Sequence, residues 1–270
     1  MGINITQRRA VKVFQPLTVQ LASTPAEIME SQALRYQVFS QEQGAFLETS
    51  LEGFDIDHHD KFCEHLLVRN SETGAVVGST RILTLENARH AGSFYSEQEF
   101  DLRGLFPLNG NAIEIGRTCI HPHYRNGAGI ATLWSGLAQY IERNHVDYLF
   151  GCASISMADG GAQAAAIMNM IRQDHTAPDT FSVKPHVRLL PTNPASTIHL
   201  PPLLKTYLKL GAWVVGEPCL DPDFNVADVF ILLDRQRLDS RYQRFFMRKN
   251  KPNSNDLLRQ KWTAQEASVW

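Results

Sequence analysis

The stretch at residues 111–134, NAIEIGRTCIHPHYRNGAGIATLW, constrains the fold more than any other part of the chain. It starts as an apolar run and reaches His121-Pro122, where a strand must stop because proline cannot donate to a sheet ladder. A glycine-bearing turn follows, and after it apolar residues recur at the spacing of one helix face. The stretch therefore predicts a strand, a glycine turn and the N-terminus of a helix.

The turn consists of Arg125, Asn126, Gly127, Ala128 and Gly129. A turn of this kind presents unpaired backbone N–H groups and the positive end of a helix dipole, which suit a phosphate or a pyrophosphate. It lacks the Lys-Ser/Thr pair of a P-loop and the spacing of a dinucleotide fingerprint, so ATP and NAD are poor candidates. A plain turn without a ligand is the alternative.

Two charged residues, Glu114 and Arg117, interrupt the apolar strand before the turn. A buried, unpaired carboxylate is costly, so the two side chains could pair with each other, or Glu114 could face solvent. Alternatively they form a site, with Glu114 as a general base and Arg117 as an anchor for a carboxylate or phosphate. In a regular strand they would point to opposite faces. The functional interpretation therefore requires a β-bulge, for which Gly116 is the expected position.

Two other groups resemble sites only superficially. Cys119 and His121 share a face of the strand, as a thiol nucleophile and its base would, but a core cysteine beside a strand-end histidine is the simpler interpretation. The loop at residues 51–60, LEGFDIDHHD, crowds carboxylates and histidines without the spaced pairs of a zinc site, so we predict no metal. We expect this loop to bind a cationic amine or to be a solvated turn.

Composition limits the class of protein. The 270 residues are 43% hydrophobic, enough for a sizeable core, and the net charge of −2 gives no basic field for nucleic acid. No run has the length of a signal peptide or of a membrane span. The four cysteines include no CxxC pair and are expected to be reduced thiols. These features predict a cytoplasmic protein and leave attachment to a membrane surface open.

The pattern of elements predicts one α+β domain over residues 1–248, with a core at 17–155 and 200–235, an insertion at 156–199 and a mobile tail at 249–270. Capping boxes at Thr24–Glu27 and Ser96–Glu99 predict two helix starts. The remaining expected elements are strands at 17–21, 65–68, 75–83, 146–153, 213–215 and 226–233, helices at 157–171 and 203–210, and an excursion at 176–202.

Taken together, these residues resemble the GCN5-related N-acyltransferase superfamily. Its fold is a central mixed sheet flanked by helices, and the resemblance implies an insertion after the fifth strand. In the family, the glycine turn holds the pyrophosphate of CoA or the phosphate of an acyl-carrier-protein phosphopantetheine arm. Here Asn126 occupies the position of the family's basic residue and Arg125 stands one position early, which favours the carrier arm over acyl-CoA. The segment from Tyr207 to Gly211 resembles a late helix of the same family.

Within this superfamily, the chain closely resembles the ornithine–acyl-carrier-protein N-acyltransferases, which make lyso-ornithine lipid. The similar segments run in order along the chain: LRYQVFSQEQGA (34–45), FDIDHHDKFCEHLLV (54–68), VVGSTRIL (76–83), GSFYSEQEFDL (92–102), EIGRTCIHPHYR (114–125), FGCASI (150–155), LPPLLKTYLKLGA (200–212) and FNVADVFILL (224–233). The resemblance implies transfer of a 3-hydroxyacyl chain from acyl carrier protein to the α-amine of ornithine. It implies no permanently bound cofactor, and work near the inner leaflet of the cytoplasmic membrane.

Acyl-homoserine-lactone synthases, which are distant relatives of these enzymes, share residues that shape the acceptor pocket and supply the base. The matching positions here are Arg35, Phe39, Asp57, Asp60, Arg81, Glu114 and Arg117. The resemblance implies that Arg117 or Arg81 holds the acceptor carboxylate and that Asp57 or Asp60 holds the δ-ammonium. Gly116 replaces a serine common in the lactone synthases, which argues against that activity.

The remaining roles are expectations of the same kind. Glu114 is the expected base, directly or through a water, and N–H groups at residues 118–120 are the expected oxyanion donors. Phe39, Phe94 and Tyr95 are candidates for an acyl slot. Arg125, Arg143 and the basic segment 241–249 are candidate docking points for an acidic carrier protein.

Three alternatives stay open. The acceptor could be another amino acid such as glycine, or the enzyme could resemble the lactone synthases in its activity. The chain could also be a non-catalytic binding module that has kept the fold.

Overall fold

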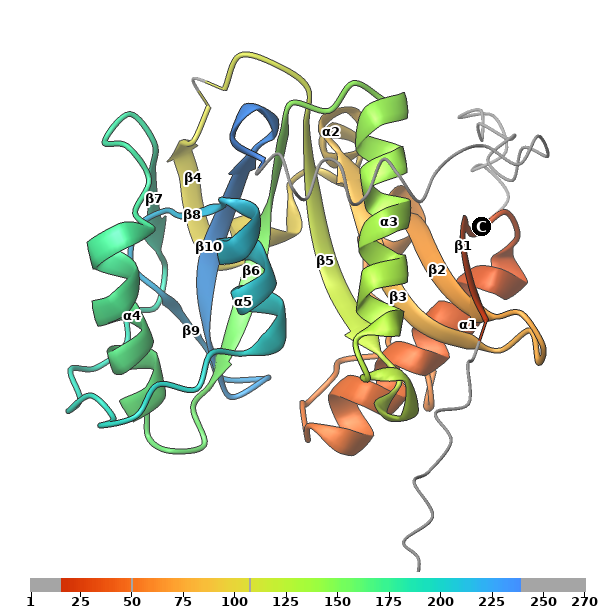
Figure 1. The fold of residues 1–270 in the computed structure, drawn as a ribbon, viewed down its shortest axis with the longest axis horizontal. Helices are drawn as coiled ribbons and strands as arrows, with labels where there is room; N and C mark the ends of the chain where they lie inside the picture. The colour runs from red at the N-terminus through yellow and green to blue at the C-terminus, as the bar shows by residue number, and fades with distance from the viewer. Residues whose placement is uncertain (1–15, 50, 107, 239–270) are drawn as a thin grey trace, which may run out of the picture.

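The computed structural model describes residues 16–49, 51–106 and 108–238, which form an eight-stranded mixed sheet and a smaller two-stranded one. The strand order in the large sheet is β1-β2-β3-β5-β6-β10-β8, and β9 also pairs with β10 (Figure 1). Its strands are β1 Leu17–Leu21, β2 Glu64–Asn70, β3 Val76–Thr84, β5 Ala112–Ile120, β6 Tyr148–Ser156, β8 Trp213–Val214, β9 Cys219–Asp221 and β10 Val226–Asp234. The small sheet pairs β4, Phe100–Gly104, with β7, Ser182–Pro185.

Helices and short strands cover both faces of the large sheet. Figure 1 shows α3 and α5 on the near face and α1 and α2 behind the sheet. The helices are α1 Pro25–Tyr36, α2 Leu85–Ala91, α3 Ala128–Arg143, α4 Ala162–Asp174 and α5 Pro202–Leu210. Leu133 and Leu137 of α3 pack on Ile113 and Ile115 in one core cluster. The α+β fold expected from the sequence is confirmed.

The opposite face of the sheet has a second core cluster. Phe150 of β6 and Phe230 of β10 lie there against Phe94 and Phe100, with ring centroids 4.9 Å apart for Phe94–Phe150 and 5.7 Å for Phe100–Phe230. Side chains alternate between the faces of a strand, so Glu114, next to Ile113 and Ile115, also faces this second side. This face, covered by residues 55–63 and 85–104, is called the acceptor face below.

A gap opens between the two central strands. The only parallel pair in the described sheet, β5 with β6, is registered over Ala112–Glu114 and Tyr148–Phe150, and the strands part beyond it. Gly151 lies where they part, with a φ of +155°, and a Cβ there would come within 2.2 Å of the Ile115 carbonyl oxygen. Glycine is therefore required at this point, because any side chain would collide with the backbone of β5.

Strand β5 contains the β-bulge that the functional interpretation of Glu114 and Arg117 requires. Arg81 of β3 pairs with Gly116 and Ser79 pairs with Cys119, so Thr80 faces two residues of β5. One of them, Arg117, has a φ of +49°, in the left-handed region. The bulge reverses the alternation after Gly116 and brings Arg117 to the same face as Glu114.

Most of the predicted elements are present, with some differences. Thr24 caps α1 as expected, and its hydroxyl accepts a hydrogen bond from the Glu27 N–H at 3.3 Å. The second capping box is wrong, because the short helix begins at Tyr95 and the Glu97 carboxylate accepts the Phe94 N–H instead. Helix α2 and strands β4, β7 and β9 were not predicted.

Strand β7 lies within the insertion predicted at residues 156–199 and pairs with β4, so this part of the chain joins the cover of the acceptor face. No helix in the described ranges is long and apolar enough to cross a membrane. The predicted tail at 249–270 and the basic segment 241–249 lie outside the described residues.

Candidate active site

Glu114 is buried on the acceptor face, with its carboxylate against the turn that opens the short helix after α2. One oxygen, Oε2, accepts the Tyr95 N–H at 2.7 Å, while Oε1 accepts the Ser96 N–H at 2.7 Å and a short bond from the Ser96 hydroxyl. Burial raises the pKa of Glu114, although the bonds from Ser96 and Tyr95 oppose that rise. Glu114 is therefore held in one position and has an increased affinity for a proton.

Arg117 reaches the same turn from the other side of the bulge. Its guanidinium donates to the Tyr95 hydroxyl at 2.9 Å and lies between two rings, with centroids 4.7 Å away for Tyr95 and 4.8 Å for Phe224. It also pairs with Asp55 at 3.2 Å and lies 3.7 Å from Asp57. The alternative in which Glu114 pairs with Arg117 does not hold among the described ion pairs, although both side chains touch Tyr95.

The loop before β2 is tied to the sheet by buried arginines. Arg35, which has no exposed surface, pairs with Asp55 at 2.8 Å and Asp60 at 2.7 Å. Arg81 pairs with Asp57 at 2.6 Å and Asp60 at 3.1 Å. Burial opposes ionisation of both Asp57 and Asp60, but attraction and hydrogen bonds from the arginines outweigh it and hold each pKa below its ordinary value.

This arginine–aspartate network consists of Arg35, Arg81, Arg117, Asp55, Asp57 and Asp60, so its formal charges cancel. The expected roles of three residues change as a result. Arg35, expected to help shape the acceptor pocket, is fully buried and bonded to aspartates. Asp57 and Asp60, expected to hold an acceptor ammonium, already neutralise arginines. Arg35 can act on a substrate only through the aspartates that it holds.

The glycine turn has open backbone donors, as expected. Gly127, with a φ of +94°, caps α3, and the Asn126 side-chain oxygen accepts the Ala128 N–H at 3.1 Å. In the described part of the chain the N–H groups of Gly127, Gly129 and Ile130 have no hydrogen-bond partner. Such a helix N-terminus suits an anion.

Arg125 turns away from these donors. Its guanidinium donates to the Ile120 carbonyl at 2.8 Å and to both oxygens of Glu42, in an ion pair that is well exposed. The basic residue of the turn is therefore engaged by protein groups, and the donors of the turn come from the backbone.

The edge of β5 that faces the gap offers a further donor. The His121 N–H bonds to the Val77 carbonyl of β3 at 2.8 Å, so the neighbouring Ile120 directs its peptide groups to the other edge by alternation. The Arg125 side chain contacts the Ile120 carbonyl on that other edge. The Ile120 N–H therefore points into the gap between β5 and β6.

Other sequence candidates lie elsewhere. Burial raises the pKa of the Cys119 thiol to about 12, and His121 lies near the surface, so the pair lacks a thiolate nucleophile.

Of the residues expected to line an acyl slot, Phe94 packs into the core. Phe39, in the π-helical turn Gln37–Glu42 that continues α1, touches the Phe224 ring edge-to-face at 5.9 Å. A surface hollow of about 660 Å³ beside β4 and β7 contains none of the expected site residues.

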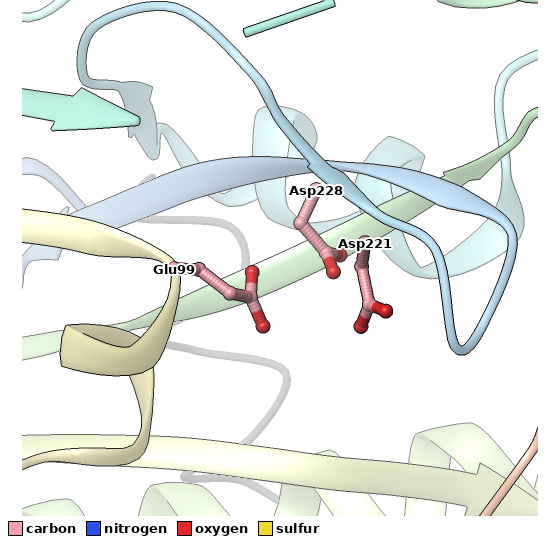
Figure 2. A group of neighbouring side chains, drawn as sticks. All are labelled: Glu99, Asp221 and Asp228. Atoms are coloured by element: carbon pink, nitrogen blue, oxygen red, sulfur yellow. The ribbon is translucent and has the colours of Figure 1, made fainter. Parts of the chain in front are cut away.

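The acceptor face also holds a group of acidic residues that the sequence did not indicate together. Figure 2 shows Glu99, Asp221 and Asp228 with their carboxyl groups directed toward one another. One oxygen from each lies within 4.8 Å of the others. Asp228 alone could have been chosen as a candidate from the sequence, because it is a carboxylate within the apolar strand VADVFILL, as Glu114 is within its own strand. Asp221 lies in β9, the strand that pairs with the strand of Asp228, whereas Glu99 comes from a distant segment that no local pattern relates to them.

The parted central strands, the open helix N-terminus beside them and the buried glutamate on the other face define an N-acyltransferase of the GNAT class. A family model described as "Acetyltransferase (GNAT) domain" matches residues 34–135. A solved structure of a CoA-dependent acyl-homoserine lactone synthase, BjaI, with MTA has the same fold, with a TM-score of 0.51 and 13% identity over 85% of this chain and 90% of that one.

Two relatives are more similar to this chain in sequence than that solved structure is. L-ornithine N(alpha)-acyltransferase of Brucella abortus is 35% identical over 249 residues, which cover 85% of this chain and 88% of that protein. The protein of the same name from Rhodobacter capsulatus is 30% identical over 248 residues, covering 86% and 95%. This chain belongs to the L-ornithine N(alpha)-acyltransferase family, which confirms the resemblance noted in the sequence.

Proposed function

We propose that the protein transfers a 3-hydroxyacyl chain from acyl carrier protein to the α-amine of ornithine and so forms lyso-ornithine lipid. The observation that carries the proposal is the position of Glu114 and Arg117 on one face of the sheet, beside the gap between β5 and β6. The names of the relatives supply the acceptor. A lipid product implies work at the inner face of the cytoplasmic membrane.

The reaction requires a base. The amine nitrogen attacks the thioester carbonyl, a tetrahedral intermediate forms, and its collapse breaks the carbon–sulfur bond and releases the thiol of the carrier arm. The attacking amine must lose a proton on the way. Glu114 accepts this proton in our proposal, through the Ser96 hydroxyl that already donates to it. A raised pKa suits this role, because it brings the affinity of Glu114 for the proton closer to that of the amine.

The intermediate also carries a negative oxygen, which needs a donor. The Ile120 N–H is our candidate, because it points into the gap and belongs to a strand fixed on its other edge by β3. A donor that is already in place before the reaction lowers the barrier without a reorganisation cost.

The donor arm enters from the side of the sheet covered by α3. The N–H groups of Gly127, Gly129 and Ile130 receive its phosphate in this proposal, and the exposed pair of Arg125 with Glu42 marks the surface where the carrier docks. An exposed pair contributes little stability, so Arg125 can exchange Glu42 for an acidic group of the carrier. A single phosphate needs fewer donors than the pyrophosphate of acyl-CoA, which favours the carrier arm.

Arg117 is the better candidate for the acceptor carboxylate. Its side chain is 12% exposed, whereas that of Arg81 is 3% exposed and already bonded to Asp57 and Asp60. Stacked between Tyr95 and Phe224, the Arg117 guanidinium is fixed in orientation and suited to a bidentate contact.

The experiment incubates purified protein with 3-hydroxyacyl carrier protein and a panel of amino acids and identifies N-acyl products by mass. We expect N-acyl ornithine from the wild type. The Glu114→Gln variant should lose about a hundredfold or more in kcat while its affinity for the carrier is retained, because a general base contributes on that scale.

Glu86→Gln is the matched control, since Glu86 is exposed in the first turn of α2. Melting temperatures report whether the Glu114 variant stays folded. Full turnover in a folded Glu114→Gln protein would remove Glu114 from the mechanism. Wild type that acylates only glycine or another amino acid would replace ornithine as the acceptor, and the absence of any product would favour a binding module.

A further inference from the structure

The acidic group on the acceptor face, Glu99, Asp221 and Asp228, differs from the arginine–aspartate network in its charge balance. No described Lys, Arg or His forms an ion pair with any of these three residues. Glu99 and Asp228 are 9% and 4% exposed. A set of buried carboxyl groups without a cation is unfavourable unless protons or a positive ligand compensate for the charge.

The three side chains are held so that they face a common point. Asp228 Oδ1 accepts the Ser154 hydroxyl at 2.7 Å, and Asp221 Oδ1 accepts the N–H groups of Asp223 and Phe224 at 2.9 and 3.1 Å. Each aspartate is thereby oriented through one oxygen. Figure 2 shows the three carboxyl groups converging from separate segments of the chain.

Glu99 supplies an independent sign of a missing partner. Its Oε2 atom is buried and, among the described residues, has no hydrogen-bond partner. Burial and the neighbouring Asp228 and Asp221 raise the pKa of Glu99 to about 9, and burial raises the pKa of Asp228 to about 6. A nine-tenths buried carboxyl oxygen without a donor, in a group whose other members are also carboxyl groups, is a position that a cationic donor would fill. Without such a donor, Glu99 keeps a proton that it shares with Asp228.

The acidic group lies next to the proposed chemistry. The Ser96 hydroxyl, which donates to Glu114, is 3.4 Å from the Cys152 sulfur, and the Cys152 thiol is close enough to Glu99 for each to influence the other's pKa. Phe224, whose N–H binds Asp221, stacks on the Arg117 guanidinium. One side of the acidic group therefore adjoins Glu114 and the other adjoins the proposed carboxylate anchor.

We infer that Glu99, Asp221 and Asp228 bind the side-chain ammonium of a diamino acid acceptor. An alkylammonium has three N–H donors and no acceptor, which matches three carboxyl groups around one point. The inference rests on the proposed function and replaces Asp57 and Asp60, whose charges the arginines already neutralise. Asp221, the most exposed member, provides the side open to solvent.

A divalent cation is the competing occupant. Magnesium and manganese bind through carboxylates together with waters, so the test below includes both ions. We choose the ammonium because the proposed acceptor carries one.

The test compares ornithine with norvaline, which has the same carbon chain without the terminal ammonium. In wild type we expect ornithine to have the higher kcat/KM and to raise the melting temperature of the protein, whereas norvaline has no effect on it. Asp221→Asn keeps the side-chain oxygen that accepts from the turn, and Glu99→Gln and Asp228→Asn preserve shape. In each variant the ornithine-to-norvaline ratio of kcat/KM should fall by about tenfold or more, as for loss of a charged hydrogen bond.

Asp101→Asn is the matched control, because Asp101 lies two positions from Glu99 and pairs with Arg103 at the surface. It should keep the wild-type ratio. The inference would be overturned if Glu99→Gln and Asp221→Asn kept the wild-type ornithine-to-norvaline ratio of kcat/KM. If the wild type also bound Mg²⁺ or Mn²⁺ and these variants lost that binding while they kept the ratio, the group would be a metal site instead. If wild type acylates no amino acid, the proposed function fails, and the ornithine-dependent rise in melting temperature still decides the inference.

Discussion

Arg35 illustrates how a single residue fixes a loop that the chemistry depends on. Its guanidinium donates to the side chain and the carbonyl of Asp55 and to both oxygens of Asp60. Asp55 and Asp60 in turn hold Arg117 and Arg81. The position of Arg117, the proposed carboxylate anchor, therefore depends on Arg35, a fully buried residue of α1.

Replacement of Arg35 by methionine should lower the free energy of unfolding by about 3–5 kcal/mol, because it leaves one negative charge of the buried arginine–aspartate network uncompensated. Urea denaturation of the two proteins gives the difference. The control is Arg103→Met, which breaks the exposed pair with Asp101 and should leave stability nearly unchanged. An equal, small effect of both substitutions would show that the network does not stabilise the fold.

His65 makes stability depend on pH in the same region. Its Nε2 donates to the Asp60 carbonyl at 3.0 Å, and burial, assisted by Arg35 and Arg81, lowers its pKa to about 4. Because the unfolded chain takes up this proton near pH 6.5 and the folded protein does so only near pH 4, the stability contribution is present above pH 6.5. It should be lost as the pH falls from about 6.5 to 4, by at most about 3 kcal/mol.

Chemical denaturation of wild type and His65→Gln across this pH range measures the effect. The variant should show a shallower loss of stability on acidification, whereas His90→Gln, at an exposed position of α2, should follow wild type. Identical profiles for wild type and His65→Gln would exclude His65 as the origin of the pH dependence.

At the level of elements, the departure of β6 from β5 depends on one glycine. Gly151 combines a φ of +155° with a backbone oxygen 2.2 Å from the position of a Cβ. Gly116, in the strand opposite, has open space around its Cβ position and no positive φ. Both glycines lie beside the gap, but only the position of Gly151 excludes a side chain.

Gly151→Ala should destabilise the protein by about 3 kcal/mol, from backbone strain and the collision with β5. Gly116→Ala should change stability little, and thermal unfolding compares the two. Equal melting temperatures for both variants would mean that the separation of the strands does not depend on Gly151.

The same elements show what the sequence can and cannot predict. The glycine turn, the hairpin of β2 and β3 and the need for a bulge beside Gly116 follow from local patterns, because each depends on residues close together in the chain. The burial of Arg35 could not be predicted, since it depends on Asp55 and Asp60 folding back over α1. The acidic group could not be predicted for the same reason. Asp221 and Asp228 lie on adjoining strands of one hairpin, but Glu99 joins them from a distant part of the chain.

At the level of the whole molecule, the sheet divides the proposed reaction between its two faces. The helix N-terminus at Gly127 and the opening between β5 and β6 serve the donor, while the acceptor face carries Glu114, Arg117 and the acidic group. The segment predicted as an insertion contributes β7, which joins the cover of the acceptor face through β4. The bound acceptor and donor would therefore meet only where the strands part.

The parting of β5 and β6 also gives the sheet two edges in its interior. Exposed strand edges usually recruit other strands and promote aggregation. Here the register over Ala112–Glu114 joins the two strands at one end, so each unpaired edge is short. We expect these short interior edges to accept a slender chain with amide groups of its own more readily than a strand of a folded neighbour. The same unpaired backbone would then select the donor and limit self-association.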